Sequence, residues 1–529
     1  MARMGLTERL SLSWLAVVGG LASLGLAYWV VSVFLSYRKL RHIKGPWLAS
    51  ISPLWLFYYT CRGTLYLAVE DALKKYGMWS IDGSRFVGPP SSIMVTIDLG
   101  SPVRIGPDYI VTDDPVIQKY MAAPRSPFVR GRWFKGMKFD TRKDNVLSMS
   151  DEKAHAELRA KLMPGYTGNE VPTLESDIDA RVVELLNLIQ RDYVDKNEAM
   201  DFAVLAGYFT LDILTQIAFG QALGFLIKNE DLYDYHKSSS QFYPIMELSS
   251  NHPMILSILR SRIMQGAAPK PTDKIGFGAI VGVAHKAVAE RFGPDPKKVQ
   301  DMLGSFVSHG LTQQECEVET LLQILAGADS TATALRTTFL FILTSPTAYA
   351  KLREEIAAVV ESWDVSYSVI KNSEAQNLRY LEACIQEGLR MFMPLQGLAG
   401  RVSPYPDGAT VNGVFIPPGT EVGIATYAMG HRRDFYGPDA DTFRPERWID
   451  NDPETIKGYG RINELVFGAG RSSCLGKRIA LMELRKAIFE LLRRYDFTLV
   501  NPFDPIKVRS NSVVVQTDMY VRAWPRKTN

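Results

Sequence analysis

The chain has 529 residues, of which 46% are hydrophobic and 22% charged, and its formal net charge is +3. This composition is that of a globular protein, and without repeats or low-complexity tracts one large domain is favoured over several. The charge is too mild for a nucleic-acid-binding protein, which needs a concentrated basic stripe. The four cysteines have no zinc-site spacing and no dense disulfide framework, which fits a reducing compartment: Cys61, Cys316, Cys384 and Cys474.

The N-terminal segment is apolar and long. No charged residue occurs between Arg9 and Arg38, and most of residues 14–35 are apolar, which meets the roughly 20-residue span of a bilayer core. A cleaved signal peptide is the alternative, but its apolar core would run only about 7 to 15 residues. Four basic residues follow at 38–44 and place the rest of the chain in the cytosol under the positive-inside rule. We expect residues 1–44 to be a single-pass anchor, which suits the endoplasmic reticulum membrane.

The following chain is expected to be mainly helical. Gly45-Pro46 predicts a short hinge, so the soluble domain should cover residues 45–529. Apolar periodicity predicts helices over 151–162, with Ser150 as N-cap, over 175–226, 317–343 and 378–391, and from just beyond Cys474. Short strands separated by Pro and Gly are expected at 401–403, 409–411 and 414–416. The expected fold class is therefore mainly α with a small β portion.

A glycine-rich segment surrounds one cysteine near the C-terminal end. Residues 467–476 read FGAGRSSCLG, just before a helix-forming stretch. Glycine lets a backbone approach a flat ligand closely, and a cysteine at a helix start has its thiolate favoured by the helix dipole. A glycine-rich turn with a structural cysteine is the plainer interpretation.

The same segment resembles the F-x-x-G-x-R-x-C-x-G haem loop of the cytochrome P-450 superfamily. The resemblance implies that Cys474 is the thiolate ligand of the haem iron, with Phe467 near the sulfur. It also implies that Gly470 and Gly476 give clearance to loop and haem. Ser472 takes the place of the family's arginine, so the neighbouring Arg471 is the candidate for a propionate contact.

A second motif lies in the long apolar helix. Residues 326–331 read AGADST and resemble the family's [AG]-G-x-[DE]-T-[TS] oxygen-activation signature. The resemblance implies that Asp329 and Ser330, followed by Thr331, pass protons to oxygen bound at the iron. Close helix packing by small residues is the alternative, with the hydroxyl bonded back to the preceding turn. Serine here replaces the family's usual threonine, which removes the β-branch that stiffens χ1.

Two further motifs have charged residues. Glu387 and Arg390 stand at i and i+3 on one expected helix, where an ion pair can form. Residues 443–448 read FRPERW and resemble the family's P-E-R-[FW] element, which implies a buried network of Glu387, Arg390 and Arg447 that serves folding. By the same resemblance His155, Arg159 and Arg401 hold the haem propionates, whereas a solvated helix face is the plainer interpretation of the first two.

These motifs occur in family order over nearly the whole soluble chain. Residues 40–47, 104–107 and 476–477 resemble fungal enzymes of the pisatin demethylase-like group, which is common in secondary metabolism. Residues 78–100 form an unusual insertion against that pattern, interpreted as an unspliced intron or gene-model error, with a genuine surface insertion as the alternative.

The resemblance implies a haem-thiolate monooxygenase with haem b as cofactor. The substrate would be a hydrophobic small molecule, expected to be a fungal secondary metabolite, oxidised with O2 and NADPH-derived electrons. Expected partners are NADPH-cytochrome P-450 reductase, docked beside Lys477 and Arg478, cytochrome b5 as a further donor, and membrane lipid. Two alternatives stay open: a haem-dependent isomerase, dehydratase or peroxygenase without reductase, and a non-catalytic haem-binding membrane protein.

Overall fold

The computed structural model describes residues 30–77, 102–266, 269–362, 364–411 and 413–526, with three isolated positions before residue 30. Most of the expected membrane span at 14–35 and the whole of the unusual insertion at 78–100 lie outside the described residues. Both therefore stay predictions. The same holds for the division of the chain at residue 45.

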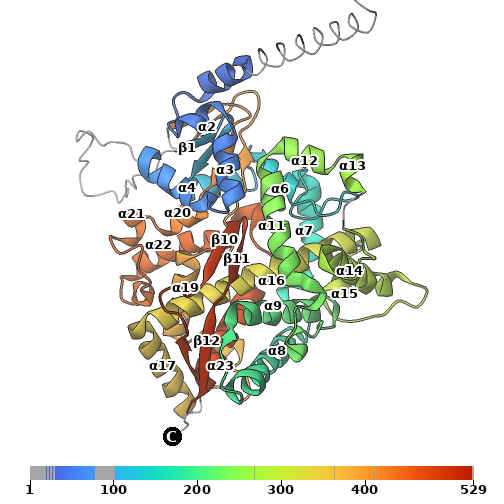
Figure 1. The fold of residues 1–529 in the computed structure, drawn as a ribbon, viewed down its shortest axis with the longest axis vertical. Helices are drawn as coiled ribbons and strands as arrows, with labels where there is room; N and C mark the ends of the chain where they lie inside the picture. Colours follow the sequence, from blue (N-terminus) through green and yellow to red (C-terminus); the bar gives the residue numbers. More distant parts are fainter. Residues whose placement is uncertain are drawn as a thin grey trace, which may run out of the picture.

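Helices make up most of the described chain and surround the long α16, which crosses the middle of the molecule (Figure 1). Their bounds are α2 (Trp47–Ile51), α3 (Leu54–Arg62), α4 (Leu65–Ala72), α5 (Pro115–Ala122), α6 (Arg132–Gly136), α7 (Glu152–Thr167), α8 (Leu174–Ile189), α9 (Phe202–Phe219), α10 (Phe225–Lys228), α11 (Tyr235–Asn251), α12 (Pro253–Leu259), α13 (Arg262–Gln265), α14 (Gly276–Phe292), α15 (Met302–Ser308), α16 (Gln313–Thr344), α17 (Pro346–Glu361), α18 (Asn372–Ala375), α19 (Arg379–Met391), α20 (Thr426–Gly430), α21 (Arg433–Tyr436), α22 (Pro453–Asn463) and α23 (Lys477–Arg494). The prediction of a mainly helical protein with a small β portion is confirmed.

The strands form small sheets at the edges of the helical body. The largest has the order β1 (Val103–Gly106), β2 (Tyr109–Thr112), β8 (Glu421–Ile424), β5 (Arg401–Val402) and β3 (Val129–Arg130). Its β2 and β8 are parallel and its other pairs antiparallel. The smaller sheets are β4 (Met200–Asp201) with β12 (Tyr520–Pro525) and β9 (Tyr495–Leu499), β10 (Lys507–Asn511) with β11 (Val513–Thr517), and β6 (Ala409–Val411) with β7 (Val414–Ile416).

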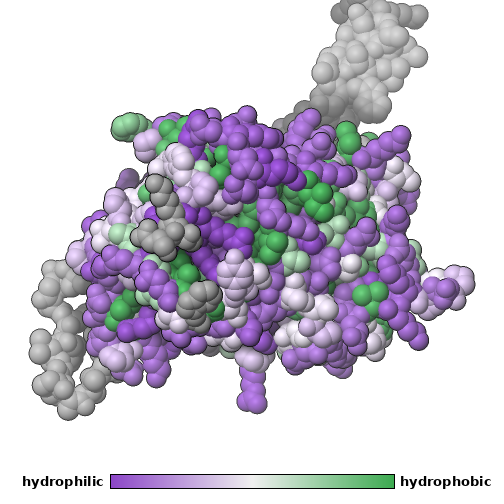
Figure 2. All heavy atoms as spheres, turned by 90° about the horizontal axis from the view of Figure 1, so that it is seen from below, coloured by the Kyte–Doolittle hydropathy of each residue, from purple (hydrophilic) through white to green (hydrophobic). Residues whose placement is uncertain are grey.

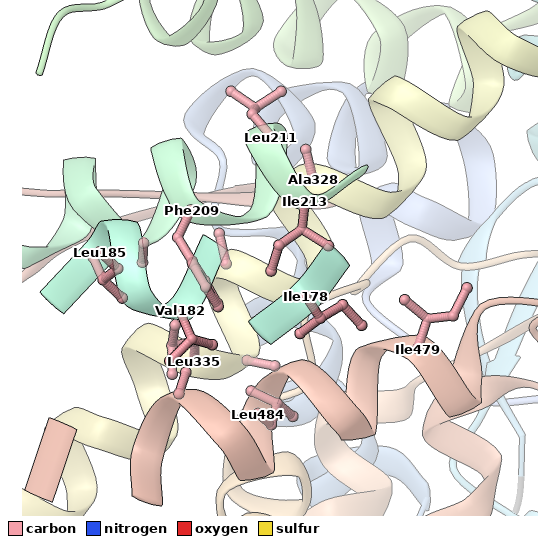
Figure 3. Packing of buried hydrophobic residues seen from close by; sticks show 14 of the residues in the cluster. Ile178, Val182, Leu185, Phe209, Leu211, Ile213, Ala328, Leu335, Ile479 and Leu484 are labelled. Carbon is pink, nitrogen blue, oxygen red and sulfur yellow. The ribbon is translucent and has the colours of Figure 1, made fainter. Parts of the chain in front are cut away.

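The main hydrophobic core lies where α8, α9, α16 and α23 meet. Figure 3 shows side chains of these four helices pointing toward one another, among them Ile178, Phe209, Leu335 and Leu484. In α8 the buried residues Ile178, Val182 and Leu185 recur every three or four positions and form one face, whereas α9 is buried on nearly all sides. Among the described residues one helix is long and apolar enough to cross a membrane, namely α9, and 89% of it is buried inside the protein, so it is a core helix.

Two local expectations need correction. The helix α7 begins at Glu152, and its N-cap is Asp151, whose carboxylate accepts from Ala154 N at 2.7 Å, instead of Ser150. The turn at Gly45-Pro46 is packed against the sheet and is not a free hinge. A Cβ on Gly45 would lie 2.1 Å from the Arg104 carbonyl oxygen, and Arg104 N donates to Lys44 O at 2.8 Å.

Arg104 also binds the helix that precedes this turn. Residues 30–40 are helical, and the Arg104 guanidinium donates to the carbonyl oxygens of Ser36 at 3.0 Å and Tyr37 at 3.5 Å. A cation at a helix C-terminus is favoured by the exposed carbonyl groups there. The first described helix is thus attached to β1 of the domain by a buried arginine.

Candidate active site

Cys474 lies in the loop between the one-turn helix η6 (Gly470–Ser472) and α23. Its backbone N donates to Phe467 O at 2.6 Å, which closes the loop on itself. Burial raises the pKa of the Cys474 thiol, while the backbone N–H groups of Gly476 and Lys477 and the Arg159 guanidinium act in the opposite direction. The sulfur thus stands at the start of α23, where backbone donors and a cation favour its thiolate.

The glycines of this loop fall into two kinds. Gly470 has φ +50°, and a Cβ there would lie 2.4 Å from the Ala122 carbonyl oxygen, so the protein itself requires glycine. At Gly476 the nearest atom to an added Cβ is Cys474 Sγ at 3.9 Å, an ordinary contact. The surrounding protein leaves room for a side chain at Gly476, and that room lies beside the sulfur.

Arginines gather on the side of the loop next to α7. Arg130 and Arg401 are register partners in β3 and β5, which puts their side chains next to one another. The Arg130 guanidinium donates to His155 Nε2 at 2.7 Å, and Arg401 donates to Ser472 Oγ at 2.6 Å. From the loop itself, Arg471 donates to Phe128 O at 2.5 Å.

The positive charge of this cluster is only partly neutralised by the carboxylate within it. Four guanidinium groups, those of Arg130, Arg159, Arg401 and Arg471, influence one another, and Glu152 is the carboxylate paired with two of them. Burial, together with the neighbouring arginines, lowers the pKa of both Arg130 and Arg401 to about 10, although Glu152 acts in the opposite direction.

The pKa of His155 is also lowered. Burial, followed by the four arginines, lowers its pKa to about 3, so its ring is neutral and its Nε2 accepts from Arg130. Arg159, the second residue expected on this helix face, donates to Ser473 Oγ at 2.9 Å.

Several polar atoms of the cluster have no hydrogen-bond partner. Among the described residues, Arg130 Nε has no acceptor, while Arg401 Nη1 and Arg471 Nε have no hydrogen bond and only the ion pairs with Glu152 at 3.8 and 3.3 Å. Buried donors without acceptors are costly, so this arrangement calls for an anionic ligand. A flat cofactor with two carboxylates and a metal that takes a thiolate ligand, such as a haem, would fit the guanidinium groups, the Cys474 thiol and the room beside Gly476.

The α16 motif is divided between two environments. Asp329 is buried, and its Oδ2 accepts hydrogen bonds from the hydroxyls of Tyr235, at 3.0 Å, and Tyr243. Ser330 is half-buried, and its hydroxyl donates to the carbonyl oxygen of Ala326 at 2.6 Å. Thr331 is buried. The serine therefore makes the bond to the preceding turn that was the plainer interpretation, while the acid is bound to a different helix.

The three residues of the expected charge network, Glu387, Arg390 and Arg447, are in direct contact with one another. Glu387 accepts from Arg390 Nε and Nη2, both at 2.8 Å, and from Arg447 Nε at 3.3 Å. All three residues are fully buried, with 0% exposed surface. Trp448 Nε1 and the backbone N of Arg444 complete the carboxylate's partners at 2.8 and 3.0 Å.

A hollow of about 230 Å³ lies beside α7 and the cysteine loop, and the buried His155 is part of its lining. Its lining includes Glu152, Arg159, Met163 and Arg471, of which Met163 is exposed. Lys477 lies nearby at the start of α23, over the Phe467 ring at 5.7 Å. This face is thus concave and mainly basic.

Comparison with known proteins assigns the family. A family model described as Cytochrome P450 matches residues 109–521. The chain is 38% identical over 526 residues to the protein named cytochrome P450 monooxygenase ABA1 of Pyricularia oryzae, with 98% of each chain covered. It is 38% identical over 490 residues to the cytochrome P450 monooxygenase aba1 of Botryotinia fuckeliana, with 91% of each chain covered. It is 36% identical over 497 residues to the cytochrome P450 monooxygenase abl1 of Leptosphaeria maculans, with 92% of this chain and 83% of that protein covered. The chain belongs to the cytochrome P450 family.

Family membership establishes the general chemistry. The chain is an enzyme of the cytochrome P450 monooxygenase kind, and its relatives are fungal proteins with that name. The family implies a haem cofactor, electrons from a redox partner and a small-molecule substrate.

Sequence reasoning missed Arg130, Tyr235 and Tyr243. Arg130 stands in a segment without motif character, and what joins it to the site is its register with Arg401 across β3 and β5. The tyrosines reach Asp329 from 94 and 86 residues away along the chain. For Arg130, the signal in the sequence would have been an arginine within a short strand. No local pattern marks the two tyrosines.

Proposed function

We propose that this chain is a haem-thiolate monooxygenase that oxidises a hydrophobic small molecule, a fungal secondary metabolite, with O2 and electrons from NADPH. The observation that carries the proposal is the Cys474 thiol at the start of α23 beside a buried, under-neutralised arginine cluster. The family match supplies the reaction class, and the fungal relatives support the substrate class.

The residues that would hold haem b are Cys474 at the iron and His155, Arg130, Arg159, Arg401 and Arg471 around the propionates. When bound, an iron porphyrin with a thiolate ligand activates dioxygen, because the thiolate pushes electron density toward the oxygen and favours O–O cleavage. Ser472 in the place of the family's arginine is compensated by Arg401 and Arg130, which donate to its hydroxyl at 2.6 and 3.4 Å. Phe467, Gly470 and Gly476 shape the loop around the sulfur.

Asp329, Ser330 and Thr331 are proposed to deliver protons from α16. Ser330 is half-buried and one turn from the accessible Ala326, so its hydroxyl can exchange the Ala326 carbonyl for another acceptor and would then donate its proton there. Asp329 is one residue earlier, and burial raises the pKa of its carboxyl group. A raised pKa favours the protonated carboxyl group, which is the form that can donate a proton.

Electrons are proposed to arrive from NADPH-cytochrome P-450 reductase at the concave basic face, with cytochrome b5 as a further donor. An exposed apolar residue, Met163, lies on α7 beside the hollow. Lys477 and Arg478 extend the positive charge along the start of α23. An acidic partner surface would be steered to this face by complementary charge.

We propose that the protein works at the endoplasmic reticulum membrane with its catalytic domain in the cytosol. Apolar side chains are exposed on the helix of residues 30–40 and on α2, α3, α12 and α13, which lie toward the same end of the molecule (Figure 1): Val30, Phe34, Trp47, Leu54, Met254 and Ile263. The opposite end, seen in Figure 2, is mostly hydrophilic with apolar patches between. The apolar side chains exposed on these N-terminal helices and on α12 and α13 support contact with membrane lipid there.

A carbon monoxide difference spectrum of the reduced full-length protein tests the proposal. The wild type should give the thiolate-type absorption, and Cys474→Ala should lose it while Cys61→Ala, an exposed cysteine elsewhere, keeps it. NADPH oxidation should then require both reductase and O2. Purified protein without porphyrin, or a thiolate-type spectrum that survives Cys474→Ala, would contradict the assignment. Turnover with peroxide but not with reductase would favour a peroxygenase instead.

A further inference from the structure

Asp329 is joined to α11 by two tyrosine hydroxyls that have no part in the proton path described above. Tyr235 and Tyr243 both donate to its Oδ2. The exposed surface is 2% for each tyrosine and 6% for Asp329, so the three polar groups meet away from bulk water. Tyr235 begins α11 and Tyr243 lies eight residues later, which means that the helix is held to the acid at two points.

The rest of α11 belongs to a different part of the molecule from α16. It packs mainly against α6, α3 and α14. Tyr243 and Met246 join an apolar cluster with Trp133, Phe134 and Met137, and the tip of the β10–β11 hairpin reaches the same cluster through Val513. The tyrosine that holds Asp329 therefore also forms part of this apolar wall.

We propose that Tyr235 and Tyr243 are positioning residues for Asp329, and that they couple the position of α11 to proton delivery from α16. The inference rests on the proposed function, since it concerns the acid of the proton path. A phenol that donates to a carboxylate favours the ionised form and fixes its direction. With both bonds made, one oxygen of Asp329 is kept against α11. When α11 moves outward, the bonds break and the carboxyl group is free to turn and bind a proton.

The other charges near Asp329 agree with this arrangement. Arg336, two turns later on α16, lowers the pKa of Asp329, and Asp231, in the segment before α11, raises it. Arg336 Nε donates to the Ala203 carbonyl of α9 at 2.7 Å, so its position is fixed from the other side. His236 lies next to Arg336, and burial lowers its pKa to about 3, which keeps its ring neutral. Among the described residues of α11, Tyr235 and Tyr243 are the ones that donate to Asp329.

The test uses the full-length holoenzyme and the variants Tyr235→Phe, Tyr243→Phe and their combination. Tyr495→Phe is the matched control, because it also removes a buried hydroxyl, one that donates to the Leu186 carbonyl at 3.2 Å. Infrared titration of the carboxyl band, assigned with Asp329→Asn, follows the acid directly. Each lost hydroxyl bond should raise the pKa of Asp329 by about one to two pH units, because a hydrogen bond to a charged group contributes about 1.5 to 3 kcal/mol.

Two further measurements separate positioning from general damage. Deuterium exchange of the peptide that contains residues 235–251 should be faster by about fivefold or more in the double variant, because α11 has lost its bonds to α16. The ratio of peroxide released to NADPH consumed, measured with reductase and no added substrate, should change its pH dependence on the acidic side by the same shift as the infrared titration. Tyr495→Phe should change none of the three.

The outcomes are distinguishable from those of the proposed function. An unchanged carboxyl titration in the double variant, in protein that keeps the thiolate-type carbon monoxide spectrum, overturns the coupling. A shift equal to that of Tyr495→Phe overturns it as well. Loss of the thiolate-type spectrum in the wild type would instead reject the proposed function itself.

Discussion

Replacing Glu387 by alanine removes the acceptor at the centre of a fully buried charge network. Its two carboxylate oxygens accept from two guanidinium groups, one indole and one backbone amide: those of Arg390, Arg447, Trp448 and Arg444. Two cations, Arg390 and Arg447, would be left in a site with 0% exposed surface. The network joins α19 to η4 (Pro445–Trp448), so its loss also separates two elements.

The magnitude follows from what the arginines retain. Breaking a buried pair by removing one partner typically costs about 3 to 5 kcal/mol, because a charge stays behind without compensation. Arg390 keeps the carbonyl oxygens of Gly430 at 2.5 Å and Ala440 at 2.7 Å, and Arg447 keeps Asp439 at 3.2 Å. Because these contacts remain, the loss of stability should stay within the range typical of a broken buried pair. We expect Glu387→Ala to lower the free energy of unfolding by about 3 to 5 kcal/mol.

Urea unfolding, followed in parallel by circular dichroism and by haem absorbance, measures the change. Glu387→Gln keeps one acceptor oxygen and should lose less, so it stays measurable where the alanine variant fails to fold. Lys457→Ala is the control, because it removes an exposed ion pair with Glu454 at 3.9 Å, and such pairs contribute about 0 to 1 kcal/mol. If Glu387→Ala and Lys457→Ala unfold at similar urea concentrations, the network does not stabilise the fold as reasoned.

Three further changes test separate parts of the site. Ser330→Ala removes the hydroxyl bonded to Ala326 O and should raise peroxide release per NADPH consumed severalfold, and unchanged coupling would remove Ser330 from the proton path. Arg130→Ala should weaken haem binding by about tenfold or more, since a hydrogen bond to a charged group contributes about 1.5 to 3 kcal/mol. The rate of haem transfer to apomyoglobin measures this loss of affinity. An unchanged transfer rate would contradict a role of Arg130 in binding the propionates. Burial raises the pKa of Glu247 to about 8, so the neutral acid is favoured in the fold and stability is lost as pH rises from the unfolded value near 4.5 through 8. Glu247→Gln keeps an acceptor for Asn511 without ionising, so its stability relative to wild type should rise between pH 5 and pH 9 in urea titrations, and a constant difference would refute the assignment.

Local sequence was sufficient for the elements whose patterns are short. The periodicity that predicted a helix over 317–343 corresponds to α16, and the Pro- and Gly-bounded strands at 409–411 and 414–416 correspond to β6 and β7. Boundaries were less secure, because a helix start depends on which side chain reaches a free N–H. Asp151 caps α7 although Ser150 is equally suitable by residue type.

The sequence also predicted contacts between residues that are near neighbours along one helix. Glu387 and Arg390 pair across one helical turn, as their spacing of three requires. The turn at Gly45-Pro46 shows the opposite case. Its residues predicted a hinge, but its contact with Arg104 is set by β1, which lies 59 residues further along the chain.

By itself the sequence determined the cysteine loop, the α16 motif and the family, because each is a run of residues whose spacing can be recognised without coordinates. Only the tertiary structure decided which groups surround them. Arg130 meets Arg401 through strand register, and Asp329 accepts its hydrogen bonds from Tyr235 and Tyr243 because the tertiary fold brings these two residues of α11 to α16. Such contacts join distant parts of the chain, and they follow from the way the whole core packs, which no local pattern records.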